Sequence, residues 1–342
     1  MSLSNKRQVV ISGGSGLIGS ALIASLIVDG YSVTQLVREY TLHHRSASRR
    51  PSDDRDPEQR DSQESRSSAS QSTSSERREV RLVTWRPGDA LDPDLVAHAC
   101  TVVCLNGAPI SRLPWTGSYR STLHDSRIFP AHTLATALTT AMSETPGIAD
   151  PPLFICASAI GYYGSQPGVV LDESGSAGHT FLAELCRDWE YAARGAEPVI
   201  PTALLRSASV LHPSALLKPL IPLARCALAG RIGTGRQIWP WITLEDEVRA
   251  IRHVMDERLT GPINLVSPHE SSELDIMCAL ARRLRRPCWL PTPASFVRLA
   301  IGKDATASLI TADAHAVPGR LTASGFTFRY AELDEAMAQA MA

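Results

Sequence analysis

The chain has 342 residues, which is enough for one large domain or two of ordinary size. Because 44% of the residues are hydrophobic, the chain can bury a sizeable core, and disorder along its whole length is excluded. The 34 basic and 35 acidic side chains leave a net charge of −1, which argues against nucleic-acid binding driven by overall charge. No run approaches the roughly 18 apolar residues of a membrane span, and no apolar leader follows Lys6 and Arg7. We therefore expect a soluble cytoplasmic protein with no nucleic-acid or membrane partner.

Strand-like and helix-like segments alternate along the first 211 residues. Strands are predicted at 8–12, 31–37, 80–85, 101–105, 152–158 and 201–209, and helices at 17–29, 92–99, 119–141 and 180–194. Nearly continuous apolar strands separated by helices are typical of a doubly wound parallel sheet, the α/β Rossmann fold. Residues 1–211 would form this nucleotide-binding domain, and residues 212–342 a smaller C-terminal α/β lobe on the substrate side.

One segment inside the first part differs from everything around it. Residues 41–79 contain almost no large apolar side chains and are rich in Ser, Arg, Asp and Glu. Such a composition cannot bury enough surface to offset the entropy lost on ordering, so we predict a disordered insertion in a surface loop.

The seven cysteines are scattered along the chain. They form no C-x-x-C pair and no Cys/His group at zinc spacing, so no metal site is expected. We interpret them as buried thiols of a reducing compartment.

A glycine-rich turn connects the first predicted strand to the first predicted helix. Gly13, Gly16 and Gly19 form G-x-x-G-x-x-G within SGGSGLIG. Glycines let the backbone approach a pyrophosphate without Cβ clashes, and the amides at the helix start receive its charge. Hydroxyls of Ser12 and Ser15 can add hydrogen bonds. The predicted cofactor contacts in this turn are Gly13, Ser15, Gly16, Leu17, Ile18 and Gly19. The alternative is a turn with no ligand.

The end of the second strand bears on the choice of dinucleotide. An acidic residue about 20 residues past the glycines binds the ribose 2′-hydroxyl of NAD, whereas an arginine there accommodates the 2′-phosphate of NADP. Arg38 and Glu39 stand side by side at this point. Because Arg38 comes first after the strand, we predict NADP, with NAD as the alternative. The competing interpretation is that Arg38 pairs with Glu39 or with the insertion.

Several runs occur in the order seen in one family. They are SGGSGLIG, WRPGDALDP, LNGAPI, WTGSYRSTLHDSR, SAIGYYG, FLAELCRDWE, GTGRQIWPWI, GPINLVSP and LTASGFTFRY. In this order the chain resembles the atypical extended short-chain dehydrogenases, the epimerase-like group with a small C-terminal domain of its own. The resemblance covers nearly the whole chain outside residues 41–79. It implies an NAD(P)-binding epimerase or oxidoreductase relative whose substrate is unassigned.

The resemblance extends the cofactor contacts. It places Arg38 at the 2′-phosphate and Trp85 near the adenine. Leu105, Asn106, Gly107 and Ala108 match the family's N-L-A-G-A turn in part. Its PWI-His-x-Asp-Asp run has Thr243 and Glu245 here in place of His and Asp, so a role for that histidine has no counterpart.

The same resemblance suggests catalytic residues. Ser158 falls where these enzymes keep a hydroxyl near the reacting carbonyl, and Tyr162 and Tyr163 follow it. The usual proton donor is a tyrosine with a lysine four residues later, which holds the ribose and lowers the phenol pKa. Counted back from Glu190, those two positions hold Leu182 and Cys186. The standard dyad is therefore absent.

Two hypotheses remain open. In the first, the protein is an NADP-dependent oxidoreductase or epimerase for a small carbonyl or sugar-nucleotide-like substrate. Ser158 would polarise the carbonyl, Tyr162 or Tyr163 would donate the proton, and an arginine could stabilise the phenolate. In the second, the protein binds NADP(H) without turnover, as a sensor or interaction protein.

Three further residues are candidates for substrate contact. Arg120 and Arg127 lie two helical turns apart on one face and could hold an anion, although a solvated helix face is the alternative. Trp241 could line a substrate pocket or belong to a core. Arg206 and Asp246 are interpreted as structural ion-pair or capping residues.

Overall fold

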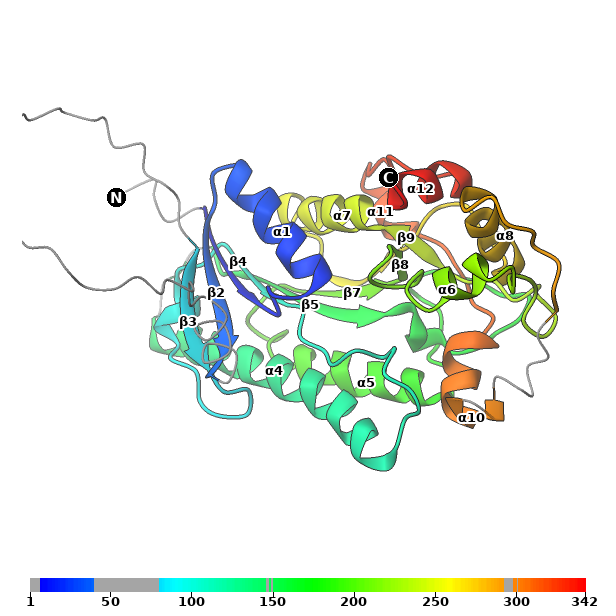
Figure 1. Ribbon diagram of the computed structural model, residues 1–342. Helices are drawn as coiled ribbons and strands as arrows, with labels where there is room; N and C mark the ends of the chain where they lie inside the picture. The colour runs from blue at the N-terminus through cyan, green and yellow to red at the C-terminus, as the bar shows by residue number, and fades with distance from the viewer. Residues whose placement is uncertain (1–6, 40–79, 146–147, 149, 292–297, 300) are drawn as a thin grey trace, which may run out of the picture.

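The computed structural model describes residues 7–39, 80–145, 148, 150–291, 298–299 and 301–342 (Figure 1). The predicted insertion at 41–79 lies outside the described residues. Within the described part, a central sheet carries helices on both faces, and further helices of the C-terminal segment lie beside it.

Seven strands form the central sheet, in the order β10-β7-β5-β4-β1-β2-β3, and all of its neighbouring pairs are parallel. The strands are β1 (Gln8–Ser12), β2 (Ser32–Arg38), β3 (Arg81–Trp85), β4 (Thr101–Cys104), β5 (Leu153–Ala159), β7 (Thr202–Ser207) and β10 (Gly261–Leu265). Six of them confirm the predicted strands to within two residues at each end. From the central pair β1 and β4, later strands are added outward to both edges of the sheet: β2 and β3 beyond β1, and β5, β7 and β10 beyond β4. This is the doubly wound topology that the sequence predicts.

Alternating side chains of the strands build two separate cores. Val9 and Ile11 pack toward α1 (Leu17–Val28) and α7 (Leu244–Asp256), whereas Val10 packs toward the opposite face. That face is covered by α4 (Gly117–Glu144) and α5 (Phe181–Arg194) (Figure 1). The short α3 (Asp94–Ala97) packs beside α4. Both faces of the sheet are therefore buried, which explains why its strands are apolar throughout.

The last strand of the sheet comes from a part of the chain assigned to the second lobe. β10 pairs with β7 in register from Gly261↔Ala203 to Leu265↔Ser207, and α7 packs beside α1. The predicted division at 211/212 therefore does not follow the sheet, because part of 212–342 completes it.

The remaining elements lie outside the central sheet. The strands are β6 (Val170–Leu171) paired with β11 (His315–Ala316), and β8 (Ser209–Leu211) paired with β9 (Trp241–Thr243). The helices are η2 (Ile160–Tyr163), α6 (Leu220–Arg225), α8 (Glu273–Arg283), α10 (Lys303–Ala305), η3 (Thr306–Ile310), α11 (Gly319–Ala323) and α12 (Leu333–Ala340). A third core holds Trp241, Ile276 and Met337 together, and thereby joins β9, α8 and α12. Across the described ranges, no helix combines the length and the apolarity that crossing a bilayer requires.

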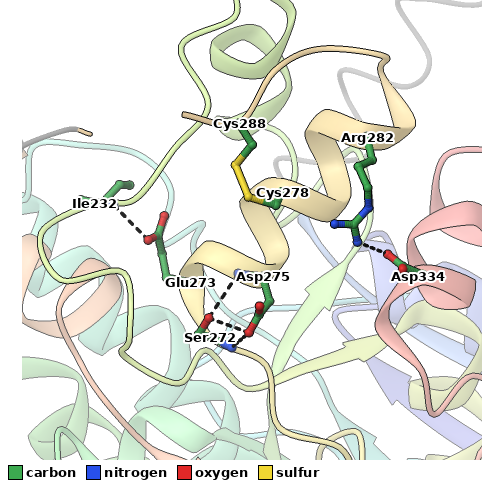
Figure 2. The surroundings of a disulfide bond; sticks show 8 residues. All are labelled: Ile232, Ser272, Glu273, Asp275, Cys278, Arg282, Cys288 and Asp334. Carbon is green, nitrogen blue, oxygen red and sulfur yellow. Dashed lines mark hydrogen bonds and ion pairs between the residues drawn. A yellow bond between two sulfur atoms is a disulfide. The ribbon is translucent and has the colours of Figure 1, made fainter. Parts of the chain in front are cut away.

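Two cysteines form a disulfide, which corrects the interpretation of all seven as thiols. Cys278 lies on α8, and Cys288 lies ten residues later beside it (Figure 2). Arg285, after the helix end, has a φ of +55°, and the chain turns back there. This reversal brings together two cysteines whose spacing carries no recognisable pattern. The buried-thiol interpretation is confirmed for Cys104, Cys156 and Cys186, whereas Cys100 is half-buried and Cys226 is exposed.

A buried carboxyl on α7 makes the stability of the fold depend on pH. Glu247 is fully buried, its Oε1 accepts a hydrogen bond of 2.6 Å from the Ser207 hydroxyl, and its Oε2 has no partner among the described residues. Burial raises the pKa of Glu247 to about 8. The folded state thus retains a proton that the unfolded state has already lost between the ordinary pKa near 4.5 and about 8.

We expect Glu247→Gln to remove the part of this dependence that comes from Glu247, while Glu273, whose pKa burial raises to about 7, still contributes in the same direction. The free energy of unfolding of the unmodified protein should fall as pH rises through that interval, by about 1.4 kcal/mol for each unit of pKa difference. Urea unfolding at pH 5.5 and pH 8.5 measures it, and the variant should be the more stable protein at pH 8.5. Glu257→Gln, an exposed carboxyl at the end of the same helix, is the matched control. Identical pH dependence of the variant and the parent would contradict the prediction.

Candidate functional site

The glycine turn lies where β1 ends and α1 begins, at the centre of the sheet. Gly13 has a φ of +79°, and a Cβ placed on it would lie 2.5 Å from the carbonyl of Leu105 in the loop after β4. A Cβ on Gly19 would lie 2.5 Å from the carbonyl oxygen of Gly13. These two glycines therefore let the helix and the neighbouring loop approach the turn closely.

The N-terminus of α1 carries no side-chain cap. Its N-cap residue is Gly16, no side chain among the described residues caps its first amides, and the first turn contains no acidic residue. Gly16 and Ser15 are exposed, whereas Leu17 and Ile18 are half-buried against the core. Ser12 is buried, and its hydroxyl donates to the Val103 carbonyl at 3.4 Å. An anion could therefore meet free amides here, with Ser15 rather than Ser12 beside it.

The ends of β2 and β3 hold the residues predicted to select the dinucleotide. Arg38 is exposed and lies in register with Trp85. Glu39 pairs with Arg86 at 2.7 Å, and among the described residues no ion pair involves Arg38, so the alternative pairing of Arg38 with Glu39 is not found. Trp85 is only 6% exposed and packs in the core on the α4 side, which leaves little of its ring open to a ligand.

The loop after β4 connects the glycine turn to α4. The amide of Leu105 donates to the Ser12 carbonyl at 3.0 Å, and the amide of Ala108 donates to the Ser126 hydroxyl at 2.9 Å. Asn106 lies between them and accepts a weak bond from the Cys104 thiol. The loop is thus held at both ends along the carboxyl edge of the sheet.

The two arginines of α4 share a face but have different neighbours. Arg127 is 9% exposed and donates to the carbonyls of Ala108 at 3.1 Å and Leu123 at 2.9 Å. Arg120 pairs with Asp304 of α10 and lies over the Phe181 ring. Only Arg127 therefore reaches the loop after β4, while Arg120 connects α4 to the C-terminal segment.

Ser158 belongs to a buried polar network between β5, β7 and α5. Its hydroxyl donates to Glu190 at 2.9 Å, and Arg206 donates to both oxygens of the same carboxylate at 2.8 and 3.0 Å. The third guanidinium nitrogen of Arg206 donates to the Tyr163 hydroxyl at 2.9 Å. This confirms Arg206 as an ion-pair residue. Glu190 is the last residue of the run FLAELCRDWE, so the family resemblance singled out this position. Nothing in the run itself indicates that its carboxylate pairs with Arg206.

The two adjacent tyrosines differ in exposure. Tyr163 is fully buried, and its hydroxyl lies 2.8 Å from both Asn264 Oδ1 and the Asp172 carbonyl. Burial raises the pKa of Tyr163 above its ordinary value, although the Arg206 guanidinium opposes this shift. Tyr162 is half-buried, with the Arg206 guanidinium 3.5 Å from the centre of its ring. Of the pair, Tyr162 is the one that retains access to a ligand.

The positions of the missing dyad are filled by side chains that carry no charge. Leu182 and Cys186 lie on α5 beneath η2, where a Cβ on Gly161 would meet both. Burial raises the pKa of the Cys186 thiol to about 12, so this thiol stays neutral. Neither a phenol nor a cation therefore comes from these two positions.

Trp241 and Thr243 serve the fold rather than an open site. Trp241 is fully buried in the third core, and its indole nitrogen donates to Ser271 at 2.9 Å, so it lines no open surface. Thr243, at the position of the family's histidine, caps α7 by accepting from the Asp246 amide at 3.1 Å. Asp246 in turn accepts from the amides of Arg329 and Tyr330, which confirms its structural interpretation.

Comparison with known proteins agrees with this architecture. Residues 9–265 match the NAD dependent epimerase/dehydratase family, and residues 292–340 match a domain of unknown function, DUF1731. An epimerase family protein of Mycobacterium bovis is 35% identical over 97% of both chains. The crystal structure of a human epimerase family protein with NADPH has a TM-score of 0.73, at 22% identity, and covers 98% of this chain and 99% of that one. A nucleoside-diphosphate sugar epimerase from Corynebacterium glutamicum has a TM-score of 0.68, at 26% identity, over 98% of this chain and 58% of that one.

Proposed function

Because this chain belongs to the NAD dependent epimerase/dehydratase family, we propose that it binds NADP(H), with the diphosphate at the turn of Gly13, Gly16 and Gly19. The observation that carries the proposal is the uncapped start of α1 directly behind this turn. Its free amides and the positive end of the helix favour a diphosphate. The human relative of similar fold was crystallised with NADPH.

The 2′-phosphate is assigned to Arg38. This exposed guanidinium at the end of β2 has no ion-pair partner within the part of the chain that the structure describes, whereas Glu39 is engaged by Arg86. NAD is the alternative cofactor, and the order of affinity for NADPH and NADH decides between the two. The loop after β4 packs against Gly13, so it would cover the inner half of the dinucleotide, which is the half that carries the nicotinamide. The residues of this loop are Leu105, Asn106, Gly107 and Ala108.

The bound cofactor would supply or accept a hydride, and the residues at the end of β5 would handle the proton. We assign proton donation to Tyr162, since its ring is accessible and lies against a permanent cation, Arg206. Ser158 directs its proton to Glu190, so it does not donate to a substrate carbonyl in this arrangement, contrary to the role expected from the sequence. Its oxygen is oriented to accept a hydrogen bond from the hydroxyl form of the substrate. A small carbonyl or sugar-nucleotide-like substrate suits this arrangement, and one relative is described as a nucleoside-diphosphate sugar epimerase.

Tyr162→Phe is expected to lower substrate-dependent NADPH oxidation by about 100-fold or more, the usual effect of losing a general acid. The dissociation constant for NADPH should stay within about threefold of that of the parent, because the Tyr162 hydroxyl is assigned to proton transfer and not to cofactor binding. The measurement is NADPH absorbance with a panel of carbonyl compounds and sugar nucleotides, followed by titration of each variant with NADPH.

Tyr163→Phe is the matched control, because it removes the same atom from the adjacent ring. Its hydroxyl is buried in the network, so this variant should lose stability, by about 1–3 kcal/mol, while the folded fraction keeps its turnover. Loss of turnover in Tyr163→Phe but not in Tyr162→Phe would contradict the assignment.

A second candidate function is binding of NADP(H) without turnover. It is favoured by Leu182 and Cys186 at the positions of the dyad, where neither a phenol nor a cation is present. This function predicts NADPH binding together with no oxidation of NADPH by any member of the panel. Absence of binding of either dinucleotide below the millimolar range would overturn both functions.

A further inference from the structure

Arg127 is a buried cation whose described partners are all neutral. It is 9% exposed, and its guanidinium donates to two peptide carbonyls and, at 3.4 Å, to the Ser126 hydroxyl. None of the ion pairs among the described residues includes Arg127. Arg206, which is also buried, has a carboxylate on two of its nitrogens. A buried charge without a counter-charge is costly, and burial accordingly lowers the pKa of Arg127.

The guanidinium of Arg127 lies against the face of α5 that carries Cys186. Its central carbon is 5.2 Å from the centre of the Trp189 ring, and Trp189 stands one helical turn after Cys186. A Cβ on Gly107 would lie 3.1 Å from the same guanidinium, so the loop after β4 is also in direct contact with it. The cation therefore lies between the loop assigned to the inner half of the dinucleotide and the helix that lacks its lysine.

We propose that Arg127 supplies, from α4, the positive charge that a lysine on α5 supplies in the enzymes this chain resembles. The anion it would face is the diphosphate and inner-ribose half of the bound dinucleotide, and the inference rests on the cofactor binding proposed above. The ligand charge would compensate the buried cation, in surroundings where water screens little. The same arrangement explains why residue 107 is a glycine, because a side chain at this position would push against the Arg127 guanidinium.

Titration of three variants with two probes tests this assignment. NADPH contains the whole diphosphate and the inner ribose, whereas adenosine 2′,5′-bisphosphate contains the outer ribose and only the adenosine-side phosphate of that diphosphate. Arg127→Met should raise the dissociation constant for NADPH by about tenfold or more and leave that for the bisphosphate within about twofold. Arg127→Lys keeps the charge but not the geometry, and should stay within about threefold of the parent for both probes. Arg38→Met, the matched control at the outer half, should weaken both probes alike.

Each other result has a definite meaning. If the parent binds NADPH and Arg127→Met binds it equally well, the assignment of Arg127 is wrong and the cofactor proposal stands. If Arg127→Lys is as weak as Arg127→Met, Arg127 only holds the loop and helix together, and the inference fails. If the parent binds neither probe, the proposed function fails instead. Where circular dichroism shows Arg127→Met unfolded, Arg127→Gln replaces it with the same expectation, because its amide can still donate to a carbonyl.

Discussion

Gly16→Val is expected to raise the dissociation constant for NADPH by roughly 100-fold or more while the protein stays folded. Gly16 has φ −77° and ψ 173°, an extended conformation that any residue adopts. A Cβ there would meet only the Gly13 carbonyl oxygen, at 3.3 Å, which requires a shift of a few tenths of an ångström. The valine would instead project from an exposed position over the amides that receive the diphosphate. The substitution therefore blocks the ligand more than it strains the chain.

Fluorescence titration with NADPH measures the loss, and thermal unfolding of the unliganded variant measures the strain. Gly117→Val is the matched control, because Gly117 is the first residue of α4 and a Cβ there meets nothing within 4 Å. It places the same side chain at another helix start, far in sequence from the turn, and should leave NADPH binding unchanged. Undiminished binding by Gly16→Val would place the diphosphate elsewhere.

Arg206→Met is expected to lower the free energy of unfolding by about 3–5 kcal/mol, the usual cost of removing one partner of a buried ion pair. Glu190 is 4% exposed and would be left without the guanidinium that occupies both of its oxygens. The Tyr163 hydroxyl and the Glu173 carbonyl would lose a donor as well. Ser158 would be the only other described donor within hydrogen-bond distance of the Glu190 carboxylate.

Urea unfolding at neutral pH measures this effect. Arg194→Met is the matched control, because Arg194 approaches the same carboxylate at 3.9 Å but its side chain is 38% exposed. Its removal should cost less than about 1 kcal/mol. Adding Glu190→Gln to Arg206→Met should restore part of the lost stability, since the stranded charge is then gone. Equal stabilities of Arg206→Met and Arg194→Met would rule out the network as a source of stability.

The amino-acid sequence by itself determined the strands from 8 to 209, the doubly wound class and the position of the glycine turn. These features depend on neighbouring residues: apolar runs specify buried strands, and glycines permit a tight turn wherever the rest of the fold lies. For Thr243 the sequence indicated only a departure from the histidine of the resembled family, and its capping of α7 came from the structure. The family resemblance rested on the same local runs.

Only the tertiary structure decided which side chains are accessible and which meet. Tyr162 and Tyr163 are adjacent and chemically identical, yet only Tyr163 is fully buried, and its hydroxyl bonds to Asn264, which lies 101 residues away on another strand. Arg127 reaches α5 beside Cys186 because α4 and α5 pack on one face of the sheet, and β10 joins β7 although it follows the predicted boundary. Such contacts depend on how distant elements pack, and a local pattern of residues carries no record of that packing.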